Sequence, residues 1–269
     1  MAGNSITFLG TGNALVKHCY NTCFWLNTPE CQLLVDAGGG NGIFTQLDKA
    51  GIKIADIHHL FLTHAHTDHL LGAVWVVRLI AQQYLKGKYE GELHIYGHHR
   101  VLQCLTDICA MLLPKKIQLF GTQAILHELT DGDSFAIGNV QFTAFDIHST
   151  KEQQFGFRAE LPQGLSLVCL GDEPFNEANR ALATGADWLL SEAFCLYAER
   201  DEFKPYEKSH STALDAGRLA AELGTKNLVL YHTEEKNLSR RKELYTAEAR
   251  TAFSGNIFVT DDLETISLD

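Results

Sequence analysis

The residues with the clearest chemical potential are three histidines and one aspartate that fall within six positions: His64, His66, Asp68 and His69. Neutral imidazole is a ligand for zinc, iron and related metals, and a carboxylate adds an oxygen ligand. The cluster directly follows the apolar run 60–62. Because so many titratable groups beside a buried strand are costly unless something pairs them, we predict a metal site here rather than a surface cluster of polar residues.

Four further apolar runs each end in one more potential ligand, namely His148, Asp172, Glu192 and His232. Binding groups gather where strand ends meet loops, and ligands of α/β folds favour the carboxyl ends of strands. One such residue alone would more often be a structural histidine or acid. Four of them, in addition to the cluster, indicate one shared site.

The elements that must position these residues follow from the hydrophobic pattern. Strands are expected at 5–9, 23–26, 32–35, 60–63, 92–96, 124–128, 134–137, 140–147, 155–160, 165–170, 186–191, 227–231 and, as the last one, 257–260. Helices are expected at 41–50, 70–85, 98–113, 175–184, 211–223 and 239–252. This order predicts sheets covered by helices, an α/β or α+β layered fold, and the absence of a long linker predicts a single domain over 1–269.

The composition narrows the class of partner. The formal net charge of −11 weighs against broad capture of nucleic acid, which depends on basic surface, so no stable DNA partner is expected. The negative net charge does not exclude a small phosphate substrate that is held by metal ions. No basic segment with a following apolar stretch opens the chain, and no apolar run approaches the ~18 residues of a membrane span. The seven cysteines are scattered, which favours free thiols in the cytoplasm.

Residues 64–69 resemble the HxHxDH signature of the metallo-β-lactamase superfamily. Other segments fall in that family's order along almost the whole chain: Phe8-Leu9-Gly10-Thr11-Gly12, Leu34-Val35-Asp36-Ala37-Gly38, His148, Gly171-Asp172 and His232. The resemblance implies a four-layer αββα sandwich with two divalent metal ions at one edge, zinc first, with manganese or iron also suited. It implies that one metal is held by His64, His66 and His148, the other by Asp68, His69 and His232, with Asp172 bridging them.

Residues 190–194 and 209–213 resemble the acidic and HST motifs of ribonuclease Z and its relatives. That resemblance implies a Glu192–His210 pair that handles the leaving-group proton beside the metals, so that Asp68, Glu192 and His210 are the expected catalytic residues. A carboxylate beside an imidazole raises the pKa of the imidazole, which suits a general acid. The alternative is that His210 is an ordinary polar residue before a helix that Ser211 or Thr212 caps.

The sequence departs from ribonuclease Z after His148, where that family inserts a long arm that grips tRNA. Here only residues 149–171 precede Asp172, enough for a hairpin. We therefore expect a compact phosphodiesterase acting on a small or cyclic phosphodiester or an RNA end, and a homodimer is considered because relatives are often dimers. The alternatives are a carboxylic ester, thioester or lactone hydrolase of the same fold, or a metal-binding protein without turnover.

Other features are given simpler interpretations. The histidine pairs 58/59 and 98/99 lack a matching partner and are expected to be non-ligands. Asp36 is a candidate for orienting a metal-binding histidine. Residues 195–208 are expected to form a solvated loop rather than a lid that carries Lys204 or Lys208 toward a phosphate.

Overall fold

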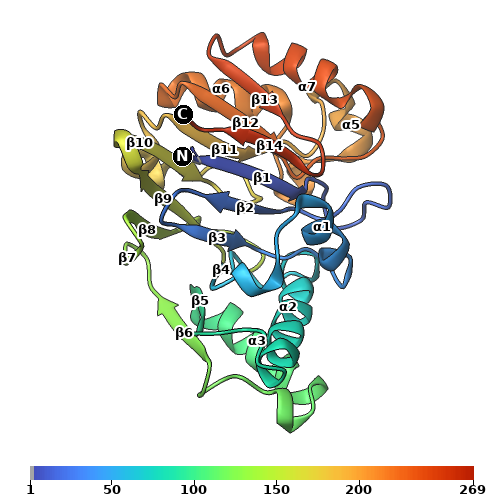
Figure 1. The fold of residues 1–269 in the computed structure, drawn as a ribbon. Helices are drawn as coiled ribbons and strands as arrows, with labels where there is room; N and C mark the ends of the chain where they lie inside the picture. The colour runs from blue at the N-terminus through green and yellow to red at the C-terminus, as the bar shows by residue number, and fades with distance from the viewer. Residues whose placement is uncertain (1–2) are drawn as a thin grey trace.

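The computed structural model describes residues 3–269, and within them the strands form two seven-stranded sheets (Figure 1). The first sheet has the order β14 (Glu264–Ser267), β1 (Ser5–Gly10), β2 (Cys23–Asn27), β3 (Gln32–Val35), β4 (His59–Phe61), β5 (Leu93–His98) and β6 (Ala124–Leu129). The second has the order β13 (Asn256–Val259), β12 (Asn227–Tyr231), β11 (Trp188–Glu192), β10 (Leu165–Cys169), β9 (Phe155–Leu161), β8 (Val140–Asp146) and β7 (Ser134–Ile137).

The helices cover the outer faces of the two sheets (Figure 1). The first sheet is covered by α1 (Gly42–Ala50), α2 (Thr67–Leu85) and α3 (His99–Leu112), and the second by α6 (Ala213–Leu223) and α7 (Arg241–Arg250). Two single-turn helices, α4 (Arg180–Ala183) and α5 (Arg200–Phe203), lie in connections. No helix in the described part of the chain has the length and apolar character that crossing a membrane requires.

Three apolar cores hold the layers together, because adjacent strand residues point to opposite faces of a sheet. In β4, Leu60 packs in the core beneath α2, whereas Phe61 packs between the two sheets against Phe157. A third core joins the second sheet to α6 and α7 and contains Tyr245, whose side chain is fully buried. The expected four-layer αββα sandwich is confirmed.

Most expected elements are present within a few residues of their expected ends, and three differ. Helix α2 begins at Thr67, three residues before the expected start. The expected helix at 175–184 shrinks to a 3₁₀ turn and the four residues of α4. The expectation that 257–260 is the last strand is wrong, because β14 follows it and pairs antiparallel with β1. In β14, one buried isoleucine stands among polar residues that are exposed or half-buried. This pattern is too short to predict a strand from the sequence by itself.

The strand directions bring the candidate residues to one edge. Strands β3, β4, β5 and β6 run parallel in the first sheet, as do β10, β11, β12 and β13 in the second. The carboxyl ends of parallel strands open at the same edge of a sheet. Residues that directly follow β4, β10 and β12 can therefore face one another.

The segment between His148 and Asp172 forms part of the second sheet. It holds a short loop, strands β9 and β10, and a 3₁₀ turn at Pro162–Gly164 that joins them. β9 and β10 pair antiparallel inside the second sheet. The hairpin expected there is confirmed, and no protruding arm is built from these residues.

Candidate metal centre

The four residues of the 64–69 cluster straddle the junction between β4 and α2. His64 and His66 lie on the extended stretch after the strand, and His66 is the N-cap residue of α2, with φ of −64° and ψ of 150°. Asp68 and His69 lie in the first turn of that helix. The change from extended to helical backbone turns them to another side of the same cavity, as expected.

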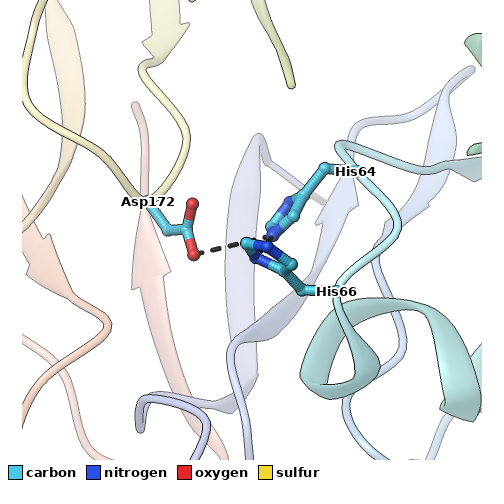
Figure 2. Close-up of side chains that lie close together, drawn as sticks. All are labelled: His64, His66 and Asp172. Atoms are coloured by element: carbon cyan, nitrogen blue, oxygen red, sulfur yellow. Dashed lines mark hydrogen bonds and ion pairs between the residues drawn. The ribbon is translucent and has the colours of Figure 1, made fainter. Parts of the chain in front are cut away.

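One group of converging ligand atoms contains His64, His66 and Asp172 (Figure 2). One ligand atom from each residue lies within 4.8 Å of the others. The Nε2 atom of His64 is 2.8 Å from Nδ1 of His66 and 3.7 Å from Oδ2 of Asp172. Asp172 reaches this point from the loop after β10, so the two sheets contribute to the same group.

A second group contains Asp68, His69 and His232, again with ligand atoms within 4.8 Å of one another. Asp68 Oδ2 is 3.4 Å from His69 Nε2 and 3.7 Å from His232 Nε2. The same Oδ2 atom of Asp172 that belongs to the first group lies 3.4 Å from His69 Nε2 and 3.3 Å from His232 Nε2. Asp172 therefore lies between the two groups, where a bridging carboxylate would have to lie.

Unpaired nitrogens show that these residues fit metal ions. Nε2 of His69 and both ring nitrogens of His232 are buried and have no hydrogen-bond partner among the described residues. A buried polar atom left unpaired costs about 1–3 kcal/mol, so an arrangement with several of them indicates a missing partner. Imidazole nitrogens and carboxylate oxygens at this convergence are the donor set of zinc, and manganese or iron would also be held.

The charges in the centre are set by burial and by the acid–histidine contacts. Burial opposes ionisation of Asp172, yet the neighbouring His64 and His232 hold its pKa well below the usual range. Burial lowers the pKa of His64 well below its usual value. Burial also works against a charge on His69, but Asp68 and Asp36 raise its pKa well above the usual value. An ionised carboxylate and a neutral imidazole are the forms that bind a cation, and binding at His69 would release a proton.

Residues behind the ligands fix their orientation. Asp36 Oδ2 accepts a 2.7 Å hydrogen bond from Nδ1 of His69 and also binds the Thr63 hydroxyl at 2.7 Å. Asp36 therefore orients the ring of His69, and its role behind a metal-binding histidine stays a prediction. Sequence reasoning missed Gln154, whose Nε2 donates to Oδ1 of Asp172 at 2.6 Å. No local pattern marks this glutamine, because its partner comes from the far end of the hairpin.

The structure does not bring His148 to the two groups. Its side chain is exposed, its backbone has a positive φ of 60°, and its N–H donates to the Asp146 carboxylate at 2.7 Å. His148 belongs to neither ligand group and lines a separate cavity of about 300 Å³ that His210 also lines. A ligand role for His148 stays a prediction.

Glu192 and His210 are adjacent, but the carboxylate is occupied by backbone groups. Its two oxygens accept hydrogen bonds from the N–H groups of Phe194 and Ser211, and Oε2 is 3.8 Å from Nδ1 of His210. Burial, with the charge of His232 next, lowers the pKa of His210 to about 3. The expected raised pKa of His210 is therefore wrong, because burial and the charge of His232 outweigh the Asp172 carboxylate. His210 is neutral near pH 7.

The alternative for His210 as a residue at a helix start is only partly met. Thr212 is the N-cap of α6 and forms a capping box with Asp215, so the helix start is completed without His210. The His210 ring instead stacks on Phe194 with centroids 4.6 Å apart and lies 5.3 Å from the ring of His232. Its Nδ1 is buried without a partner among the described residues.

A cavity of about 470 Å³ opens above the two groups. Asp68, Asp172, His210 and His232 form its floor, and its walls include Asn13, Leu15, Lys151, Phe194, Lys208 and Glu234. The segment 195–208 thus contributes a wall residue, Lys208, rather than only a solvated loop. The seven cysteines, all within the described residues, are free thiols and none contributes a ligand to the groups above.

Comparison with known proteins agrees with this architecture. The family described as "Anti-Pycsar protein Apyc1" matches residues 4–243. A protein named "Ribonuclease Z" from Methanothermobacter thermautotrophicus is 26% identical, over 98% of this chain and 96% of its own.

Solved structures share the fold. The metallo-β-lactamase fold protein YhfI from Bacillus subtilis superposes with a TM-score of 0.80 at 20% identity, covering 98% of this chain and 99% of that one. The human short-form tRNase Z, ELAC1, gives 0.77 at 24% identity with the same coverage. The chain has the metallo-β-lactamase fold, belongs to the family described as anti-Pycsar protein Apyc1, and is a ribonuclease Z-like, metal-dependent hydrolase.

Proposed function

We propose that the protein holds two divalent cations and hydrolyses a small or cyclic phosphodiester. The observation that carries this proposal is the position of Asp172, whose Oδ2 lies between the group of His64 and His66 and the group of His69 and His232. Two cations bound there would act as Lewis acids on the phosphoryl oxygens and lower the pKa of a water molecule. Zinc is the first candidate, with manganese and iron next.

The protein's own residues prepare that centre. The low pKa of Asp172 keeps it ionised, and Gln154 fixes its second oxygen. Asp68 is held ionised in the same way, because the nearby His69 and His232 outweigh the effect of burial on its pKa. Asp36 fixes the ring of His69, so that its Nε2 points at the centre. These contacts keep the ligand atoms in place before any substrate enters, which is the preorganisation that catalysis needs.

His210 is the residue we propose for handling the departing oxygen. It lines the cavity next to His232, and its neutral ring carries one N–H that can donate to an oxygen of the substrate. Glu192 acts one step behind it, since its oxygens hold the N–H groups of Phe194, whose ring stacks on His210, and of the adjacent Ser211. We propose Glu192 as a positioning residue for His210.

The size of the substrate follows from the cavity and the missing arm. A volume of about 470 Å³ falls in the range of small-molecule sites, roughly 300–1,000 Å³. The segment that carries the arm in ribonuclease Z forms only the β9–β10 hairpin here. An RNA 3′ end is the second candidate, favoured by the name of the ribonuclease Z relatives.

Free cysteines support a cytoplasmic location, and the acidic net charge of −11 supports the absence of a stable DNA partner. A homodimer and a single domain remain expectations.

A substrate panel with elemental analysis tests the function. Protein reconstituted with zinc or manganese is offered bis(p-nitrophenyl) phosphate, 2′,3′-cyclic nucleotides, a precursor tRNA, a lactone and a thioester. We expect about two metal ions per chain and turnover of the phosphodiesters that chelation abolishes. Turnover confined to the lactone or thioester would identify an acyl hydrolase, and full metal content with no turnover would identify a metal-binding protein.

A further inference from the structure

Two loops from different parts of the chain meet beside the cavity, and each contributes one lysine to its lining. We call them the lysine strap, made of residues 149–151 after β8 and residues 204–209 before α6. Thr150 Oγ1 and Ser209 Oγ lie 3.3 Å apart, and Nζ of Lys151 donates to the backbone carbonyl of Lys208 at 2.9 Å. Lys151 and Lys208 both line the cavity above the metal-binding groups.

The two ammonium groups are not equivalent. Lys151 Nζ is 3.2 Å from Oε1 of Glu173, a buried carboxylate that also accepts from Ser149 at 2.8 Å. Its charge is therefore largely compensated. Lys208 forms no ion pair with any residue in 3–269, and its Nζ lies over the ring of Phe194, 5.0 Å from the centroid. Lys208 thus places a positive charge in the lining of the cavity without a carboxylate at ion-pair distance.

That charge matters because the rest of the molecule repels an anion. The chain carries a net charge of −11, and the cavity lining also holds Glu234, whose pKa burial raises and the charge of Lys208 lowers. A positive charge in contact with an anionic oxygen attracts it more strongly at the intermediate dielectric of a protein surface than in bulk water, so its position decides where an anion is held. The contact with Phe194 restrains the flexible lysine stem, so less entropy is lost when the ammonium binds.

We propose that Lys208 binds the charged, non-bridging oxygen of the phosphodiester in the cavity, and that Lys151 is a positioning residue that holds the Lys208 backbone in place. The proposal rests on the proposed phosphodiester hydrolysis and deepens it, since it names the residue that selects an anionic substrate. Lys204, in the same loop, is exposed, lies outside the cavity and pairs with Glu207 at 3.9 Å. It provides a matched control of equal charge.

The test compares Lys208→Met with Lys204→Met in the metal-loaded, full-length protein. For bis(p-nitrophenyl) phosphate we expect KM to rise about 10–100-fold in the Lys208 variant, the size of a hydrogen bond to a charged group, while kcat changes little. The KM of the Lys204 variant should stay within about twofold, as expected for an exposed charge away from the site. Equal KM values in the two variants would overturn the proposal.

Binding of inorganic phosphate, measured by calorimetry on the metal-loaded protein, separates this proposal from the proposed function. Weaker phosphate binding in Lys208→Met, with unchanged binding in Lys204→Met, supports anion binding by Lys208 even if no phosphodiester is turned over. Unchanged phosphate binding overturns it whatever the activity.

Lys151 is tested by rescue. Lys151→Met should raise KM in the same direction as Lys208→Met, and Lys151→Arg should restore it, because arginine can still donate to the Lys208 carbonyl. A lower melting temperature of Lys151→Met with unchanged KM would show a merely structural role and overturn the positioning role.

Discussion

Two regions of the first sheet are rich in histidine, and only one of them is arranged to bind metal. In the metal centre, the rings of His64, His66 and His69 meet Asp68 and Asp172.

The other region, which we call the edge cluster, contains His58, His59, His94 and His127 on and beside β4, β5 and β6. Here the imidazoles contact one another: His59 stacks on His94 at 5.2 Å, and His94 Nδ1 lies 2.9 Å from His127 Nε2.

The difference follows from where the residues lie on the strands. His59 and His94 are cross-strand partners, as are Tyr96 and His127, so their rings project side by side from one face of the sheet. Rings spaced at the strand separation of about 4.8 Å stack and do not converge. The ligands of the metal centre instead come after the strands end, where the backbone is free to turn inward. Among the described residues, the edge cluster offers no group of three converging ligand atoms.

Carboxylates are the second difference. The metal centre contains Asp36, Asp68 and Asp172, all buried, whereas the carboxylate paired with the edge cluster in the described part of the chain, Glu92, is 55% exposed and 3.6 Å from His94. Without a buried acid, burial and the neighbouring histidines lower the pKa of His59 to about 4. Histidine number is therefore a poor guide to a metal site, and the convergence of histidines with buried acids is a better one.

The largest expected effect separates the two regions directly. Asp172→Ala should abolish metal binding and phosphodiester turnover together, because it removes the atom shared by both ligand groups. The matched edge variant, His94→Ala, should keep its metal content and its kcat. Elemental analysis of the purified variants, alongside turnover of bis(p-nitrophenyl) phosphate, measures both. Metal retained in Asp172→Ala but lost in His94→Ala would reverse the comparison.

A smaller effect is expected at His210, which lies in the cavity but outside the proposed ligand set. His210→Ala should lower kcat by roughly 10²–10⁴, the usual size of assistance from a positioned proton donor, while the metal content is unchanged. His127→Ala serves as the control from the edge cluster. Unchanged turnover in His210→Ala would remove this histidine from the mechanism.

The smallest effect concerns folding and belongs to the edge cluster. The pKa of His59 is about 4 in the folded protein and near its ordinary value of 6.5 in the unfolded chain. Folding therefore favours neutral His59, and its contribution to stability is present above pH 6.5 and is lost as the pH falls toward 4.

As the pH falls, we expect the free energy of unfolding of the wild type to decrease by about 1–2 kcal/mol because of His59, a figure reduced for screening by solvent. The variant His59→Gln should not show this part of the decrease. Urea unfolding between pH 7.5 and 4.5, with a chelator present, measures the difference. The exposed His99→Gln should follow the wild type, and an identical pH dependence in His59→Gln would contradict the assignment.

The same contrast explains what the sequence could predict. Residues 64–69 fall together along the chain, and Asp172 and His232 each follow an apolar strand, so their convergence was predictable from the pattern of strand ends. The layered fold was predictable for the same reason, because period-two and helical patterns alternate along the chain.

Features that depend on local backbone geometry were not predictable. Gln154 reaches Asp172 only because the hairpin folds back on β10, and His148, at a positive φ, is exposed and lies outside both ligand groups. The lysine strap required two loops more than 50 residues apart to meet, as Thr150 and Ser209 do at a separation of 59 positions. No spacing in the sequence encodes such a contact.

The most direct test of the central claim is anomalous diffraction from crystals grown with zinc, with data collected on both sides of the zinc absorption edge. We predict two peaks beside Asp172, one bound by His64 and His66 and the other by Asp68, His69 and His232, at about 2.0–2.2 Å from their ligand atoms. No peak should appear at the edge cluster. Peaks confined to His94 and His127, or ligands at 172 and 232 that point away from residues 64–69, would contradict the account.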